Sequence, residues 1–371
     1  MKLPLILIAS FALHLLGSTV PAMAAEHGRR TENILLITLD GLRWQEVFQG
    51  ADPELMDKSN GGIQDTNKLR KWFGGGTVEE RREALLPFFW TVMAKQGQVF
   101  GNQKKGSIAR VTNGLKFSYP GYNEMLTGRP DSRVNSNAKI LNPNVTVLEW
   151  LNGQPAFKNR VAAFCAWDVF PFILNRGRSG LFVRAGWEWL ADSKDSPRAA
   201  VLNELSRDTA RLWEDEVYDS FIFLAAADYL KKQKPRVFFV SFGETDEWAH
   251  AGRYDQTLIS ARRTDDFIRR LWNLAQSMRQ YRGKTTLILT TDHGRGSGPA
   301  EWKNHGQNVP GAEDIWMAFL GPDTESLGER SHSSPLTQSQ IAATIAAFLG
   351  QDFPHSFPEA ALAIREVLSR N

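Results

Sequence analysis

Acidic residues and histidines occur in this 371-residue chain at spacings that suit metal binding. Asp246 and His250 are four residues apart, so a helical segment would place both side chains on one face. Asp292 and His293 adjoin, and His305 follows in the sequence Asn-His-Gly. Carboxylates and imidazoles together suit zinc or manganese rather than copper or an iron–sulfur cluster. The pattern therefore predicts two sites for divalent metal ions.

Some of these candidate ligands have a competitor or a plainer explanation. His332 is the alternative to His305, although its polar sequence Arg-Ser-His-Ser-Ser-Pro is typical of a loop. Asp40 is followed by glycine, and an Asp-Gly pair after an apolar run is usually a turn. Because Asp246 and Asp292 also come shortly after apolar runs, the three acids together favour a ligand role for Asp40.

The segment around Ser118 offers a nucleophile for such a site. Ser118 lies two residues before Pro120, which can occupy the first turn of a short helix that runs to about Thr127 and ends at Gly128. A hydroxyl there faces the helix amides, which favour a phosphate, and a neighbouring metal would lower its pKa. Two alternatives remain: the serine only caps the helix, or Thr112 is the nucleophile, although nothing after it opens a helix.

Short apolar runs and longer helical patterns alternate along the chain and must position these residues. Strands that are apolar on both faces and alternate with helices indicate an α/β fold, with a largely parallel central sheet and helices on both faces. Ligands of such sheets bind beyond the carboxyl ends of the strands. The predicted strands are 34–39, 160–166, 236–242, 285–291 and 314–320, and the predicted helices are 78–96, 200–213, 216–232, 256–280 and 338–349.

The first 25 residues are typical of a secretory signal peptide, with Lys2, an apolar stretch and small residues before a cleavage point near Ala24 or Ala25. An uncleaved membrane anchor is the alternative, but its apolar stretch of about 14 residues falls short of the roughly 20 that span a bilayer, so no stable membrane span is expected after cleavage. We expect a periplasmic or secreted protein. The periplasm is favoured because the chain has one cysteine and can form no intrachain disulfide.

A single catalytic domain is expected over residues 26–371, with insertions near 50–80 and 167–200. The second insertion contains Trp167, Trp187 and Trp189, which either line a lid over the site or pack into the core.

Composition excludes several classes of protein. Lys and Arg number 44, Asp and Glu 41, and 42% of residues are hydrophobic, which excludes a disordered tail, a collagen-like chain and a strongly basic nucleic-acid binder. No nucleic-acid partner is indicated. Cys165 stands alone in an apolar run, so a cysteine-based zinc site is also excluded.

Together these motifs resemble the alkaline phosphatase superfamily, and most closely its type I phosphodiesterase / nucleotide pyrophosphatase branch. The resemblance spans residues 40 to 345. The matching motifs are Asp40-Gly41-Leu42-Arg43, Ser118-Tyr119-Pro120 with Leu126-Thr127-Gly128, Asp246-x-x-x-His250, Thr291-Asp292-His293-Gly294, His305 and a C-terminal helix at 340–345.

The resemblance implies an alkaline phosphatase-like fold and a hydrolase of small phosphate esters, a phosphodiesterase or phosphatase that acts through a phosphoseryl intermediate. It implies two divalent ions, Zn²⁺ or alternatively Mn²⁺. One would be held by Asp246, His250 and His305, and the other by Asp40, Asp292, His293 and the Ser118 oxygen. A diester would accept a hydrogen bond from Asn137 or Asn135, whereas a dianionic monoester would pair with Arg43, Lys116, Arg129 or Arg133. The alternative is that the asparagine is an ordinary loop residue.

Two departures from that branch leave alternatives open. Gly121-Tyr122 stand where nucleotide pyrophosphatases usually have Asn-His, and the twelve-residue gap from His293 to His305 is more like the phosphomutase branch. A phosphoryl transferase or mutase is therefore one alternative. A sulfatase is disfavoured because no arginine follows the Ser-x-Pro sequence, and a non-catalytic exported binding protein is disfavoured by the intact ligand set.

Overall fold

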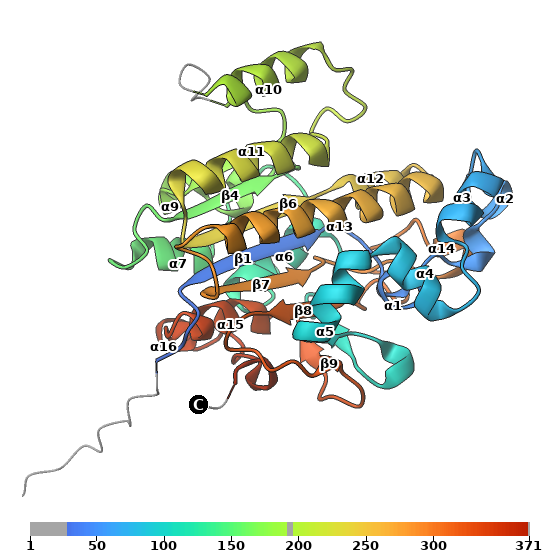
Figure 1. The fold of residues 1–371 in the computed structure, drawn as a ribbon. Helices are drawn as coiled ribbons and strands as arrows, with labels where there is room; N and C mark the ends of the chain where they lie inside the picture. The colour runs from blue at the N-terminus through green and yellow to red at the C-terminus, as the bar shows by residue number, and fades with distance from the viewer. Residues whose placement is uncertain (1–27, 191–195, 370–371) are drawn as a thin grey trace, which may run out of the picture.

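The computed structural model describes residues 28–190 and 196–369 (Figure 1). The signal peptide expected at 1–25 lies outside these residues. Within the described ranges, every helix is too short or too polar to span a lipid bilayer.

An eight-stranded sheet forms the centre of the molecule. Its strands are β1 (Asn33–Leu39), β2 (Gln98–Phe100), β4 (Val161–Cys165), β5 (Phe182–Ala185), β6 (Val237–Phe242), β7 (Thr285–Thr290), β8 (Met317–Leu320) and β9 (Gly328–Glu329). Their order is β5-β4-β6-β1-β7-β8-β2-β9. The pairs from β5 to β7 are parallel, whereas β8 runs antiparallel to β7 and β2. The prediction of a largely parallel α/β sheet is confirmed.

Helices cover both faces of this sheet, because its central strands are apolar on both sides (Figure 1). Leu35 and Ile37 face a core shared with α4 (Val78–Leu85), α11 (Asp219–Gln233) and α13 (Tyr254–Ser277). Ile34 and Leu36 face the opposite core. The helices on that side are α6 (Ser118–Thr127), α7 (Val147–Gly153) and α15 (Gln340–Phe348).

The remaining helices and strands lie around this framework and in the connections. They are α1 (Trp44–Gln49), α2 (Lys58–Gly61), α3 (Thr66–Phe73), α5 (Ala94–Gln96), α8 (Phe170–Ile173), α9 (Arg176–Ser179), α10 (Pro197–Asp208), α12 (Glu244–His250), α14 (Gly298–Glu301), α16 (Phe353–Ser356) and the strand pair β3 (Ala109–Arg110) and β10 (Leu336–Thr337).

The predicted helix 78–96 is broken in the structure. Helix α4 ends at Leu85, and Leu86 has φ −127 and ψ 68, outside the helical region. Proline disfavours the helical conformation in the residue before it, and Pro87 follows directly. A π-helical turn at Phe89–Met93 then leads into α5. The predicted strand 314–320 likewise starts later, at Met317.

The segment 167–200, which was expected to be an insertion, contributes a strand to the central sheet. Strand β5 lies in this segment and forms one edge of the sheet. Trp187 is 8% exposed, packs against Tyr218 and Phe221, and donates its Nε1 hydrogen to the Trp213 carbonyl at 3.0 Å. Trp189 is 65% exposed. Trp187 is therefore a packing residue, as in the core interpretation.

Truncating Trp187 should destabilise the protein. We expect Trp187→Ala to lower the free energy of unfolding by about 3–5 kcal/mol and Trp189→Ala to change it by less than about 0.5 kcal/mol. Urea unfolding measures both. Neither variant should raise KM for a bulky aryl ester more than for a small one, and a selective rise without lost stability would restore the lid interpretation.

Candidate metal centre

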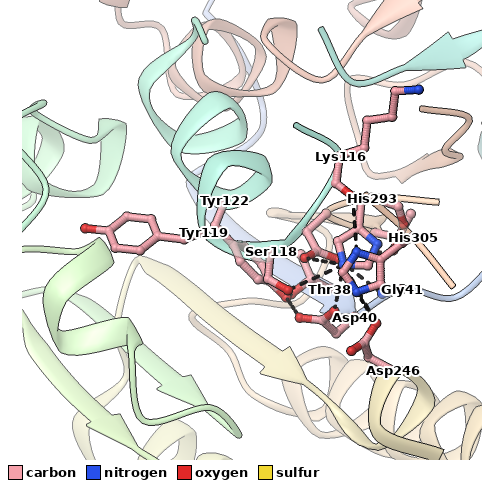
Figure 2. Close-up of polar contacts among 12 residues, drawn as sticks. Thr38, Asp40, Gly41, Lys116, Ser118, Tyr119, Tyr122, Asp246, His293 and His305 are labelled. Carbon is pink, nitrogen blue, oxygen red and sulfur yellow. Dashed lines mark hydrogen bonds and ion pairs between the residues drawn. The ribbon is translucent and has the colours of Figure 1, made fainter. Parts of the chain in front are cut away.

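The candidate ligands meet at the carboxyl ends of three neighbouring strands. Asp40 follows β1, Asp246 lies in α12 just after β6, and Asp292 follows β7. Because β1 is paired with β6 on one side and with β7 on the other, the three acids are brought to one edge of the sheet. Figure 2 shows Asp40, Asp246, His293 and His305 gathered there, beside the start of the Ser118 helix.

We call Asp40, Asp292 and His293 the inner group, whose ligand atoms lie within 4.8 Å of one another. His293 Nε2 is 3.5 Å from Asp40 Oδ1 and 3.5 Å from Asp292 Oδ2. Both oxygens are buried, and within the described part of the chain neither has a hydrogen-bond partner. Since buried polar atoms are nearly always bonded, two such oxygens facing one imidazole nitrogen fit a divalent cation.

We call Asp246, His250 and His305 the outer group, whose ligand atoms also lie within 4.8 Å. His250 Nε2 is 2.9 Å from His305 Nε2 and 3.1 Å from Asp246 Oδ2. The two groups adjoin, since His293 Nε2 is 3.7 Å from Asp246 Oδ1. The outer donor set also fits a divalent cation that accepts nitrogen and oxygen ligands.

Surrounding hydrogen bonds orient these ligands. His293 Nδ1 donates to the Gly294 carbonyl at 2.9 Å, and His305 Nδ1 to the Lys116 carbonyl at 3.2 Å, which leaves the Nε2 lone pair of each ring facing the centre. The Tyr122 hydroxyl donates to Asp40 Oδ2 at 2.9 Å. The Gly41 amide donates to Asp292 Oδ1 at 3.1 Å. Each inner carboxylate thus has one oxygen fixed by the protein and the other turned to the imidazole.

The crowded acids and histidines have strongly displaced pKa values. Burial, reinforced by Asp292 and Asp246, raises the pKa of Asp40 well above its usual range. Burial and the Asp246 charge raise the pKa of Asp292 to about 8. Burial lowers the pKa of His305 to about 4 and places that of His293 well below its usual value. A bound divalent cation would favour the ionised carboxylates and the neutral imidazoles, and so would relieve the carboxylate repulsion.

Ser118 is the first residue of α6 and does not cap it. Phe117 occupies the N-cap position. Ser118 Oγ lies 3.4 Å from His293 Nε2, and the side chain is 7% exposed. The helix start packs closely on the inner group, because a Cβ at Gly121 would lie 2.4 Å from the Asp292 carbonyl oxygen. The hydroxyl therefore faces the candidate metal centre, and the capping interpretation is wrong.

The alternative residues Thr112 and His332 have other contacts. Thr112 Oγ1 donates to the buried Glu124 carboxylate at 2.8 Å, and its backbone amide binds the same carboxylate. The His332 backbone amide donates to the Lys105 carbonyl at 2.9 Å, in a residue with φ +48. Among the described residues, neither ligand group includes His332.

Asn137 lies directly beside the nucleophile segment. Its Oδ1 accepts the backbone N–H of Tyr119 at 3.0 Å, and the Tyr119 hydroxyl donates to the Ile140 carbonyl at 2.6 Å. The side chain of Asn137 is exposed. Its Oδ1 contact places the amide group beside the backbone of the residue that follows Ser118.

The four cationic candidates are engaged elsewhere. Arg43 is buried and pairs with Glu46, and its Nη1 donates to the Gly296 carbonyl at 3.1 Å. Lys116 Nζ is 2.9 Å from Glu313, and Figure 2 shows its side chain directed away from the ligands. Arg129 and Arg133 both contact Asp131 and Asn144.

Two residues at the centre were not among the sequence candidates. Tyr122 fixes Asp40, and its only signal was the departure from Asn-His at 121–122. Arg295 is 1% exposed and donates through Nη2 to Asp246 Oδ1 and, at 3.1 Å, to the Asp246 carbonyl. Its signal was its position immediately after the Asp292-His293-Gly294 motif.

Comparisons with known proteins bear on the family and the fold of the chain. A model of the type I phosphodiesterase / nucleotide pyrophosphatase family matches residues 51–310. A comparison with curated proteins gives no match.

Solved structures share the fold at low identity. The phosphonate monoester hydrolase SpPMH from Silicibacter pomeroyi is 14% identical, with a TM-score of 0.55 over 91% of this chain and 77% of that one. The lipoteichoic acid synthase LtaP from Listeria monocytogenes is 10% identical, with a TM-score of 0.56 over 92% of this chain and 76% of that one. A variant of the alkaline phosphatase PafA is 10% identical, with a TM-score of 0.56 over 92% of this chain and 99% of that one.

Proposed function

We propose, because this chain belongs to the type I phosphodiesterase / nucleotide pyrophosphatase family of the alkaline phosphatase superfamily, that it is a metal-dependent phosphodiesterase with Ser118 as its nucleophile. The observation that carries the proposal is the position of the Ser118 hydroxyl, 3.4 Å from His293 at the junction of two groups of metal-ligand type. The substrate is a small phosphate diester. Following the expected signal peptide, we place the enzyme in the periplasm or outside the cell.

The inner group with the Ser118 oxygen would hold one divalent ion, and the outer group the other. Zn²⁺ suits these nitrogen and oxygen donors, and Mn²⁺ is the alternative. When bound, such ions supply Lewis-acid stabilisation of charged phosphate oxygens and lower the pKa of a neighbouring hydroxyl.

The residues of the chain then act in two displacements. Ser118 Oγ loses its proton and attacks phosphorus, and the bond from phosphorus to the leaving alkoxide breaks, so the alcohol departs with a proton. Water next attacks the phosphoserine ester, which releases the monoester and restores the Ser118 hydroxyl. Asn137 Nδ2 donates to a non-bridging oxygen in both steps, and the amides at the start of α6 face the same anion.

The charges around Ser118 favour a diester over a monoester. A monoester dianion needs side-chain cations beside the metals, but Arg43, Lys116, Arg129 and Arg133 are all paired with other residues. Asn137 offers a neutral donor that suits the single charge of a diester.

Removing the Asn137 amide tests this proposal. We expect Asn137→Ala to lower kcat/KM for bis(p-nitrophenyl) phosphate by about 10- to 100-fold, because one hydrogen bond to a charged oxygen is lost. Asn135→Ala, in the same exposed loop, is the matched control and should change little. The wild type should prefer the diester to p-nitrophenyl phosphate.

Other outcomes of the same assays would reassign the chain. A preference for p-nitrophenyl phosphate, unaffected by Asn137→Ala, would indicate a phosphatase. Product that forms only when an alcohol is supplied would indicate a transferase or mutase. Turnover of p-nitrophenyl sulfate above that of both phosphates would indicate a sulfatase.

A further inference from the structure

We propose that Arg295 makes the two metal sites unequal, so that the outer group binds its cation more weakly than the inner group. The inference rests on the proposed metal sites and concerns their order of affinity.

Arg295 is fixed against the outer group by its contacts. Its side chain is 1% exposed, its Nη2 donates to Asp246 Oδ1, and its Nη1 donates to the Lys303 carbonyl at 2.5 Å. The turn after β1 closes over this pair, because a Cβ at Gly41 would lie 2.3 Å from Asp246 Oδ1 and 2.9 Å from Arg295 Nε. The guanidinium is therefore enclosed beside Asp246.

The contact involves the Asp246 oxygen that is directed toward the junction of the two groups. Oδ1 lies 3.7 Å from His293 Nε2 and 4.0 Å from His305 Nε2. Oδ2 lies on the other side, 3.1 Å from His250 Nε2. Since Arg295 already holds Oδ1, an outer cation competes with a guanidinium for that oxygen or depends on Oδ2 alone.

Charge separates the two groups in the same direction. The inner group has two carboxylates, Asp40 and Asp292, and counts −2 when both are ionised. The outer group has one carboxylate, and the Arg295 guanidinium paired with it neutralises its charge. At short range in a buried site, this difference favours a divalent cation in the inner group.

A chelator titration of the zinc-loaded, full-length protein measures this order. Bound zinc is determined by mass spectrometry after dialysis against increasing chelator, so activity is not the readout. We expect two steps in the wild type, with the weaker one absent in His250→Ala and the stronger one absent in His293→Ala.

Variants of Arg295 test the cause. We expect Arg295→Met to shift only the weaker step, with an affinity gain of about 10- to 100-fold, because the competing charge is removed. Arg295→Gln keeps a hydrogen-bond donor but removes the charge. It replaces Arg295→Met in the test if circular dichroism shows that the Met variant does not fold. Arg110→Met is the matched control. Arg110 also pairs with an aspartate, Asp314 at 2.7 Å, but it lies on β3 and outside both ligand groups.

Each result supports or overturns the inference. The inference is supported if two steps are seen, if the weaker step is the one lost in His250→Ala, and if the Arg295 variants strengthen that step. The inference is overturned if the two steps are equal or if the weaker step is the one lost in His293→Ala. It is also overturned if the Arg295 variants weaken the outer site or leave its affinity unchanged. A protein that binds no zinc at all would instead contradict the proposed function.

Discussion

Replacing Ser118 by alanine should reduce turnover by about three orders of magnitude or more, because the residue that forms the covalent intermediate is removed. Folding should be preserved. Phe117 is the N-cap of α6, so no capping hydrogen bond is lost with the hydroxyl. Metal should be retained through the inner group. Measurements of kcat for bis(p-nitrophenyl) phosphate, metal content and urea unfolding on one preparation separate these effects.

Two variants control for this result. Ser118→Thr should keep part of the activity, since a secondary hydroxyl can still attack. Thr112→Ala should lose some stability through its contact with Glu124 but retain turnover. Near wild-type turnover in Ser118→Ala, together with an inactive Thr112→Ala, would transfer the nucleophile to Thr112.

Removing metal should have the second large effect. We expect about two divalent ions per chain when fully loaded, since three protein ligands plus water or substrate are usual for an open catalytic zinc. Strong chelation should abolish hydrolysis, and added zinc or manganese should restore it. Chelation should also lower Tm, because a ligand that binds only the folded state stabilises it, and because Asp40 Oδ1 and Asp292 Oδ2 lose their partner.

Histidine variants locate the ions. His250→Ala and His293→Ala should each lose one ion, as measured by mass spectrometry of the loaded protein. His332→Ala is the matched control and should keep both, because that histidine lies outside the two ligand groups. A wild-type protein without metal, whose activity responds to neither chelator nor zinc, would contradict the two-metal assignment.

Much of the sheet could be predicted from the sequence, because its central strands are buried on both faces. Strands β1, β6 and β7 are buried throughout and consist mainly of apolar and β-branched residues, and each is soon followed by an acid. The parallel topology then requires those acids to meet. The proximity of Asp246 and His250 could also be predicted, because residues four apart lie one turn apart on a helix, as they do in α12. The catalytic and metal-binding roles of these residues stay predictions.

Contacts between distant segments could not be predicted. Periodicity does not show that Tyr122 reaches Asp40 or that Arg295 reaches Asp246, because each contact depends on how separate elements pack. The opposite error concerned Arg43, which appeared available for phosphate but pairs with Glu46 in the next turn. The break in the predicted helix 78–96 was visible in principle, since Pro87 was in the sequence.

The central position of β1 has a consequence for how the chain folds. Its register places Thr38 beside Ser241 of β6 and Thr290 of β7, so the first strand pairs only with partners that are synthesised much later. Closing such long loops costs entropy before any pairing energy is gained, and high contact order slows folding. The candidate centre takes its residues from the ends of β1, β6 and β7 and from the segment up to His305, so it can form only after these three strands have paired. We therefore expect native-like cation binding to report the pairing of these three strands, and a fragment that ends before β7 to lack it.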